Sequence, residues 1–313
     1  MRTESPPIIY LKDYAPLAFS VSTIDLDVHI GDAFTEVTAT LMVERRINAS
    51  ANAELVLDGE DLELVSVKVN DDLLSPEHYV LTESTLRLRG LLHNARIETV
   101  VRIHPDANTQ LSGLYRSKDG YFTQCEAQGF RRITFYPDRP DVMAKFRCRI
   151  EADAAKFPQL LSNGNPVANG VLAGGRHFAV WEDPFKKPAY LFALVAAKLE
   201  MREDFFVTAS GRRVRCAVYV EPGKLDQCAH ALAALKMAMK WDEDTFGLEM
   251  DLDHYMIVAV GDFNMGAMEN KGLNIFNTKY VLARPDTATD VDFDGIEAVI
   301  AHEYFHNWTG NRV

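Results

Sequence analysis

Residues 302–306 read His-Glu-Tyr-Phe-His, a set of side chains whose types and spacing suit metal chemistry. On a helix, His302 and His306 lie one turn apart on the same face, so their side chains can share one ion. Glu303 is turned about 100° from His302 and reaches a water beside the metal without ligating the metal. Zinc lowers the pKa of such a water to about 7, and a neighbouring carboxylate takes its proton. The motif therefore predicts a zinc centre with His302 and His306 as ligands and Glu303 as general base.

The residues ahead of this motif predict the helix that must position it. Asp294 and Glu297 have the spacing of a capping box, so we expect the helix to begin at Asp294. Ile296, Val299 and Ile300 then form its apolar face. The alternative is a surface helix that carries two histidines by chance. The capped, amphipathic pattern disfavours that alternative, whereas the remaining histidines are isolated and are expected to be packed or solvated residues.

The first two-thirds of the chain shows the alternation of apolar and polar residues that is typical of half-buried strands. We therefore expect a mainly β N-terminal domain over residues 1–198, built from antiparallel sheets with one face inward. A turn-rich stretch at 162–170 is predicted to be a hairpin loop, and the apolar run at 189–197 a buried strand. The alternating segments are residues 24–30, 37–43, 65–69, 85–91 and 96–103.

The pattern changes after residue 198. Apolar residues recur at helical spacing over 224–241, which predicts an amphipathic helix. Residues 255–260 are a short apolar run that predicts a strand ahead of the metal motif. We therefore expect residues 199–313 to form the first part of an α+β domain that carries the zinc centre.

Composition limits the classes of partner. The 313 residues carry a net charge of −12, which argues against general binding to nucleic acid or to an anionic membrane. The four cysteines are scattered, so they predict neither a disulfide framework nor a zinc knuckle. Residues 1–14 lack the pattern of a signal peptide, and the longest apolar run, 189–197, is too short to span a bilayer. These features together predict a cytoplasmic protein.

A second motif lies between the predicted strand and the zinc motif. By composition, residues 266–270, Gly-Ala-Met-Glu-Asn, are a loop with one carboxylate. The segment resembles the exopeptidase signature of the M1 family of zinc aminopeptidases, the gluzincins. The resemblance implies an edge strand on which Glu269 binds the free α-amino group of a peptide by a charge-assisted hydrogen bond. It also implies that the strand, through backbone groups of Gly266 and Ala267, holds the peptide. The other residues assigned to substrate binding in this segment are Met268 and Asn270.

A third motif lies far upstream. Residues 123–133, Thr-Gln-Cys-Glu-Ala-Gln-Gly-Phe-Arg-Arg-Ile, resemble the N-terminal-domain motif of the same family. The resemblance implies that Glu126 reaches the same amine, and that Gln124 and Met265 line the pocket for the first side chain. Arg139 stands where many members have glutamate. That variant is similar to the bacterial aminopeptidase N branch of the family.

The resemblance covers the whole chain and implies more than the motifs do. It implies a saddle-like β domain followed by part of a thermolysin-like catalytic domain, with one Zn²⁺ for each full-length chain. It implies peptides with a free N-terminus as substrates and a monomeric enzyme. The third zinc ligand and the tyrosine that stabilises the transition state are expected beyond Val313. We therefore expect an N-terminal fragment with little peptidase activity of its own.

Two alternatives stay open at this point. A leukotriene-type epoxide hydrolase with aminopeptidase activity shares the zinc motif and a similar exopeptidase segment. Glu126 and the Phe-Arg-Arg run that follows favour the peptidase branch. The other alternative is a non-catalytic module that binds peptide N-termini. The sequence predicts neither the preferred N-terminal residue nor the physiological substrate.

Overall fold

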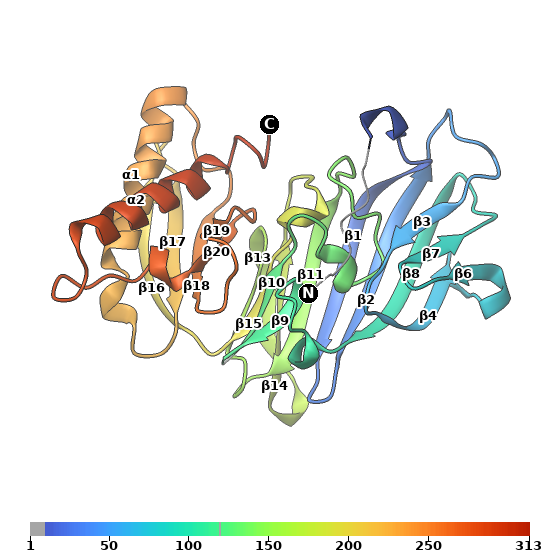
Figure 1. The fold of residues 1–313 in the computed structure, drawn as a ribbon, viewed down its shortest axis with the longest axis horizontal. Helices are drawn as coiled ribbons and strands as arrows, with labels where there is room; N and C mark the ends of the chain where they lie inside the picture. The colour runs from blue at the N-terminus through green and yellow to red at the C-terminus, as the bar shows by residue number, and fades with distance from the viewer. Residues whose placement is uncertain (1–9, 119) are drawn as a thin grey trace.

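The computed structural model describes residues 10–118 and 120–313, and Figure 1 shows the path of the chain. Residues 1–9, which make up most of the segment tested above for a signal peptide, lie outside the described residues. A β-rich part, drawn in blue to yellow-green, is followed by a smaller part that carries two longer helices. The predicted class, mainly β and then α+β, is confirmed.

The largest sheet has eight strands in the order β13-β14-β11-β1-β2-β8-β4-β5. Its alternating residues bury one face, as β1 shows, where Ile24, Leu26, Val28 and Ile30 are all buried. The sheet is mixed, because β1 pairs parallel with β11 while it pairs antiparallel with β2. The expectation of purely antiparallel sheets is wrong there. The strands are β1 (Phe19–Ile30), β2 (Thr35–Arg45), β4 (Glu63–Val69), β5 (Asp72–Leu73), β8 (Asn94–Ile103), β11 (Lys145–Asp153), β13 (Asn165–Val171) and β14 (Arg176–Glu182).

Two smaller sheets complete the β-rich part. A three-stranded sheet has the order β3-β7-β6, and a four-stranded sheet has the order β12-β15-β10-β9. The first contains β3 (Leu55–Asp58), β6 (Tyr79–Leu81) and β7 (Thr85–Leu88). The second contains β9 (Gly113–Ser117), β10 (Gly120–Gln124), β12 (Gln159–Ser162) and β15 (Leu194–Ala197).

Two local predictions in this region are wrong. The stretch 162–170 is not a hairpin loop, because β12 ends at Ser162 and β13 begins at Asn165 in a different sheet. The turn residues therefore lie where the chain passes from the four-stranded sheet to the eight-stranded sheet, and not between two paired strands. The apolar run 189–197 is buried as expected, but it begins as a 3₁₀ turn, Ala189–Leu191, and only Leu194–Ala197 is a strand.

The C-terminal part is a five-stranded sheet, in the order β16-β17-β18-β20-β19, with two helices on one face. Alternation along β17 divides its residues between two cores. Cys216 and Val218 pack with both helices, whereas Ala217 and Tyr219 face the four-stranded sheet of the β-rich part. The elements are β16 (Glu200–Val207), β17 (Arg213–Val220), α1 (Ala229–Phe246), β18 (His254–Val260), β19 (Ala267–Met268), β20 (Leu273–Asn277) and α2 (Asp290–Phe305).

Both helices occur where the periodicity predicted them, but their ends differ. The first begins at Ala229, after a 3₁₀ turn at Leu225–Gln227, and continues to Phe246. Gly247 ends it with a φ of 67°, a left-handed conformation that glycine adopts without strain. The second begins four residues earlier than predicted, because a different residue caps it.

The N-cap of α2 is Thr289 and not Asp294. The Thr289 side chain accepts a hydrogen bond from the backbone N–H of Asp292, and the Asp292 carboxylate accepts one from the Thr289 N–H at 2.8 Å. Asp294 lies inside the first turns of the helix and is exposed. The predicted apolar face is correct, since Ile296 and Ile300 are fully buried.

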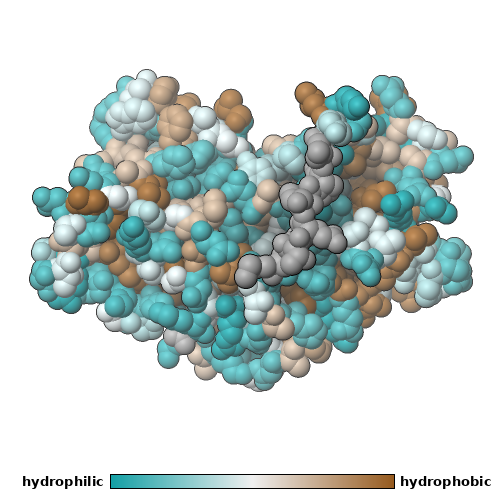
Figure 2. All heavy atoms as spheres, in the orientation of Figure 1, coloured by the Kyte–Doolittle hydropathy of each residue, from teal (hydrophilic) through white to brown (hydrophobic). Residues whose placement is uncertain are grey.

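The two parts share one apolar core. Leu191 and Val195 from the β-rich part pack in the same cluster as Met256 and Val258 of β18. The predicted boundary at residue 198 stays a prediction, because this cluster is continuous across it. Figure 2 shows a face dominated by hydrophilic residues, with apolar residues scattered among them. Within the described residues, no helix has the length and apolarity needed to cross a membrane.

Candidate metal and peptide site

The two histidines of the metal motif converge at the C-terminal end of α2. His302 and His306 are four residues apart on this helix, and their Nε2 atoms lie 3.1 Å from each other. Two nitrogens bound to one tetrahedral zinc at ordinary Zn–N distances are separated by about 3.3 Å. The two rings therefore fit a shared metal ion.

Contacts around His306 fix which ring nitrogen faces its neighbour. Its Nδ1 lies 2.8 Å from the carbonyl oxygen of Thr309, so Nδ1 donates and Nε2 is left with its lone pair. Gly310 makes this geometry possible. Its φ is 123°, and a Cβ there would lie 3.0 Å from Nδ1 of His306. The turn after α2 therefore holds His306 in the tautomer that binds metal.

Glu303 follows His302 on α2 and is nearly buried, with 6% of its surface exposed. Its Oε2 atom is buried and has no hydrogen-bond partner. Burial, and then the carboxylates of Glu269 and Glu126, raise the pKa of Glu303 to about 8. A carboxyl group with a raised pKa binds a proton readily, and a cation beside it stabilises its ionised form.

Three carboxylates from distant parts of the sequence meet here. Partial burial, and then Glu269, raise the pKa of Glu126, while His306 lowers it. Ligand atoms of Glu269, Glu303 and His306 all lie within 4.8 Å of one another. This trio differs from the pair of histidines that the motif predicted. The site thus offers two settings for a cation: the two imidazole nitrogens, and a mixed set of two carboxylates with His306.

The strand that directly precedes Glu269 is an edge strand. Ala267 and Met268 form β19, which pairs antiparallel with β20, and the N–H of Asn277 donates to the carbonyl of Gly266 at 2.9 Å. Among the described residues, no strand pairs with the other side of β19. A free edge of this kind can accept an extended peptide through main-chain hydrogen bonds.

The predicted substrate residues differ in what their side chains can reach. Met268 and Asn270 are buried, and Met268 packs in the core shared by the two parts. Their side chains therefore hold β19 in place, and only their main-chain groups remain for a ligand. Met265 is half exposed, so its side chain is free to form a pocket wall. Gly266 lies close to the Tyr280 ring, which a Cβ would approach to 3.3 Å.

Gln124 and Glu126 come from the other part of the molecule. Gln124 ends β10 and is buried, and its Oε1 atom has no hydrogen-bond partner. Glu126 follows two residues later in the turn after β10 and is exposed. A strand of the four-stranded sheet thus carries one carboxylate of the site, while β19 of the five-stranded sheet carries another.

One residue at the site was missed by the sequence analysis. Burial first, and then the charges of Glu269 and Glu126, raise the pKa of Tyr190, so its phenol lies within the electrostatic reach of both carboxylates. Tyr190 belongs to the apolar run that was predicted to be a plain strand. Its phenol was the only polar group in that run, and this is the signal that could have found it.

The fold and this site together define a metallopeptidase architecture, and comparison with known families agrees. Residues 20–191 match the Peptidase M1 N-terminal domain, and residues 230–313 match the Peptidase family M1 domain. The chain therefore belongs to peptidase family M1.

Curated relatives match along the entire chain. Aminopeptidase N of Caulobacter vibrioides is 53% identical over 313 residues, which is 100% of this chain and 36% of that protein. Aminopeptidase N of Escherichia coli is 53% identical over 311 residues, 99% of this chain and 35% of that protein. The chain thus spans little more than a third of the length of these relatives.

A solved structure shares the fold. The crystal structure of Legionella pneumophila aminopeptidase A in complex with aspartic acid superposes with a TM-score of 0.93 at 38% sequence identity. It covers 96% of this chain, and the match spans 36% of that structure's chain.

Proposed function

We propose that the polypeptide carrying this chain is a zinc aminopeptidase that removes N-terminal residues from peptides. The proposal rests on one observation. Glu126 and Glu269, two carboxylates that can bind an amine, lie beside the metal motif that contains Glu303. Carboxylates beside a metal motif can bind the ammonium group of a free N-terminus by charge-assisted hydrogen bonds. The names of the relatives, aminopeptidase N and aminopeptidase A, support the same reaction.

In this proposal His302 and His306 hold Zn²⁺, since their Nε2 atoms are 3.1 Å apart. Bound zinc polarises the scissile carbonyl and acidifies the attacking water. Glu303 takes the proton of that water. Its Oε2 atom is buried and has no hydrogen-bond partner, so that oxygen is not committed to another group of the described residues. The resemblance implies that a glutamate and a tyrosine beyond residue 313 supply the third ligand and the stabilisation of the oxyanion.

Glu126 and Glu269 accept hydrogen bonds from the ammonium group of the substrate. A cation at this point relieves the repulsion among the three carboxylates and favours the ionised form of Glu303, which a general base requires. The peptide lies along the free edge of β19, where Gly266 and Ala267 offer main-chain groups. Gln124 and Met265 border the pocket for the first side chain, and Met265 suits an adaptable pocket.

The substitution Glu303→Gln tests the role of the base. It preserves size and removes the proton acceptor, so hydrolysis of an aminoacyl arylamide by the complete gene product should fall about 100-fold or more. Zinc content, measured by elemental analysis, should stay at the wild-type level, because Glu303 is not a ligand. Turnover that persists in this variant with zinc bound would remove Glu303 from the mechanism.

The same proposal includes a monomeric protein in the cytoplasm. The four cysteines are free and buried, as is usual in a reducing compartment. Gel filtration at several protein concentrations tests the oligomeric state, and a mass that rises with concentration would contradict a monomer.

Among the described residues, no feature of the site favours epoxide hydrolysis over peptide hydrolysis. A pair of carboxylates that can bind an amine favours peptide hydrolysis.

A further inference from the structure

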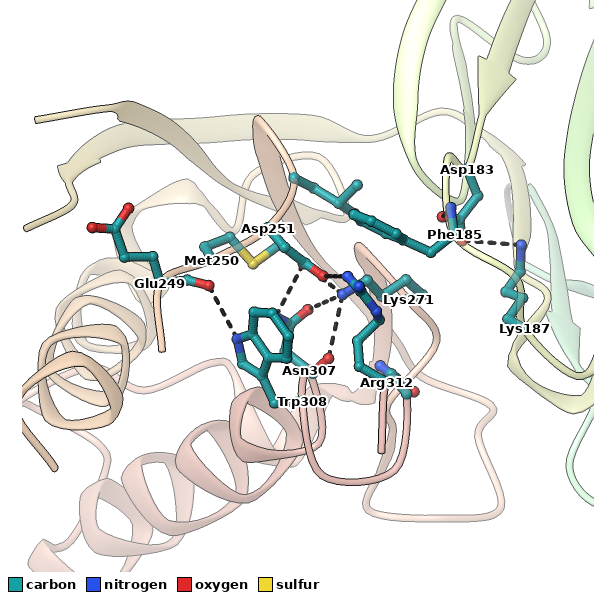
Figure 3. Close-up of polar contacts among 12 residues, drawn as sticks. Asp183, Phe185, Lys187, Glu249, Met250, Asp251, Lys271, Asn307, Trp308 and Arg312 are labelled. Atoms are coloured by element: carbon teal, nitrogen blue, oxygen red, sulfur yellow. Dashed lines mark hydrogen bonds and ion pairs between the residues drawn. The ribbon is translucent and has the colours of Figure 1, made fainter. Parts of the chain in front are cut away.

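A buried lysine joins the amine-binding segment to the end of the metal-binding helix. Lys271 follows Glu269 by two residues and is 1% exposed. Its ammonium donates to Asp251 Oδ1 at 2.6 Å, to Asn307 Oδ1 at 2.8 Å and to the Asn307 carbonyl at 3.3 Å. Figure 3 shows these contacts converging on the Lys271 side chain. All three N–H donors of the ammonium are therefore used.

Further bonds fasten the same two segments. Asn307, which directly follows His306, donates through Nδ2 to Asp251 at 3.2 Å. Asn311 donates through Nδ2 to the carbonyl of Glu269 at 3.0 Å, so one bond acts on the amine-binding residue itself. We call Lys271, Asp251, Asn307 and Asn311 the Lys271 network.

Two further residues, Arg312 and Trp308, hold the segment that follows α2. Arg312 forms an ion pair with Asp251, and its guanidinium stacks 3.6 Å from the centre of the Phe185 ring. Trp308 donates through Nε1 to the carbonyl of Glu249 at 3.0 Å. The segment after α2 is thus fixed at several points, and Asp251 keeps a cationic partner even without Lys271 (Figure 3).

The connection matters because the two segments have no covalent or helical link that sets their spacing. Glu269 directly follows the edge strand β19, whereas His302, Glu303 and His306 belong to α2 and its end. An aminopeptidase must hold its amine-binding carboxylate at a fixed distance from the metal. A displacement of about 1 Å costs on the order of 100-fold in rate when reacting groups must be aligned.

We propose that Lys271 is a positioning residue, which through Asp251 and Asn307 sets the spacing between the Glu269 carboxylate and the metal-binding histidines. The inference rests on the proposed aminopeptidase function. Lys271 touches neither substrate nor metal, and it acts on cleavage by holding the loop after β19 against the segment after α2.

A buried ion pair can also be merely structural, and the chain offers a matched control. Lys187 is equally buried, at 1% exposure, and lies 3.1 Å from the Asp183 carboxylate. Its ammonium stacks 4.0 Å from the centre of the Phe146 ring. Among the described residues, this pair, drawn beside the network in Figure 3, makes no hydrogen bond or ion pair to residues 269–271 or 306–312. Lys187→Met therefore removes the same charge from a similar setting and leaves every hydrogen bond of the Lys271 network in place. Its effect on the network is limited to the charge of Asp183, which also acts on Lys271.

The test compares Lys271→Met with Lys187→Met in the complete gene product. We measure melting temperature, zinc content, kcat and KM for an aminoacyl arylamide. Calorimetry then measures binding of a non-cleavable peptide with a free N-terminus and of its N-acetylated twin. Both variants should lose melting temperature and keep zinc. Lys271→Met alone should lower kcat/KM about 100-fold and reduce the preference for the free amine.

The outcomes separate the two claims. A wild-type protein without preference for the free amine would contradict the proposed function. A normal preference in the wild type that Lys271→Met leaves unchanged, with kcat/KM equal to that of Lys187→Met, would overturn the positioning role. Loss of zinc in Lys271→Met would overturn it too, because the network would then support the metal site and not the spacing.

A milder variant covers the case in which Lys271→Met does not fold. Asn307→Ser removes the side-chain bonds to Lys271 and Asp251 but leaves the ion pair and the main-chain contact. It should lower kcat/KM in the same direction by a smaller factor, again with zinc bound. An unchanged free-amine preference in a folded Asn307→Ser protein would contradict the proposal.

Discussion

At the scale of single residues, the site is defined by charges that repel one another. Glu126, Glu269 and Glu303 converge with His306, and burial together with this repulsion raises the pKa of Glu303 to about 8. Carboxylates this close repel one another unless a cation lies between them or two of them share a proton. Under the proposed function, the substrate brings an ammonium group and the histidines hold a metal ion, so two cations join these carboxylates.

Asp242 gives a second residue-scale effect, and it predicts a pH dependence of stability. This side chain of α1 is 2% exposed and lines an apolar groove of about 650 Å³ with Trp241, His302 and Phe305. Burial raises its pKa to about 6, so the folded chain binds this proton more tightly than the unfolded chain. The stability due to the neutral carboxyl is complete below pH 4 and is lost as pH rises through about 6.

The variant Asp242→Asn cannot ionise and should escape that loss. Urea unfolding of the 313-residue chain should show the variant more stable than wild type at pH 8, by on the order of 1–3 kcal/mol. Below pH 4 the two free energies of unfolding should converge. An equal difference in the free energy of unfolding between variant and wild type at both pH values would show that ionisation of Asp242 does not destabilise the folded chain.

At the scale of elements, α2 is positioned by both of its ends as well as by its buried face. Its N-terminus carries the capping box of Thr289 and Asp292, and its C-terminal side is fixed by the Lys271 network. Between them Ile296, Ile300 and Tyr304 are buried in the apolar core. A helix that presents two ligands to an ion needs this fixed axial position.

Removing the cap should therefore be measurable. Thr289→Ala takes away the acceptor for the Asp292 N–H, so the free energy of unfolding should fall by about 1 kcal/mol. Asp294→Ala is the matched control, since Asp294 has the chemistry of a cap but lies inside the exposed first turns. Its effect should stay within about 0.5 kcal/mol. A larger loss for Asp294→Ala than for Thr289→Ala in denaturant unfolding would reverse the assignment of the cap.

At the scale of the whole molecule, the site lies where two sheets meet. Glu126 follows a strand of the β-rich part and Glu269 follows β19, so their approach depends on how the sheets pack. The shared apolar core fixes that packing, and Asn163 adds polar contacts across the seam. Its side chain donates to Leu191 and Lys271 carbonyls at 3.0 and 2.9 Å and accepts from the Ala193 N–H at 2.7 Å.

The shared core predicts that both parts unfold in one transition. Asn163→Ala leaves three buried main-chain groups without partners, and should destabilise the molecule by about 3 kcal/mol or more. Asn169→Ala, at an exposed position of β13, is the control and should change little. Calorimetry should show one peak that moves as a whole. Two resolved peaks, of which only one moves in Asn163→Ala, would contradict a shared core.

The sequence by itself determined the local elements and the chemical groups. Alternation predicted the strands around Ile24–Ile30 because each strand buries one face. The spacing of His302 and His306 predicted a shared ion because it is one helical turn. Resemblance assigned Glu269 to an edge strand, and Glu269 directly follows the edge strand β19. These features depend on neighbours within a few positions, which a sequence displays directly.

Only the tertiary structure decided the features that join distant segments. Thr289 and Asp294 both have side chains that can cap a helix, and in the fold the cap is Thr289. The parallel pairing of β1 with β11, the closeness of Tyr190 to the carboxylates, and the bonds of Lys271 to Asn307 have no local signature. Each is a contact between residues far apart in the chain, and its free energy depends on how whole sheets and helices pack.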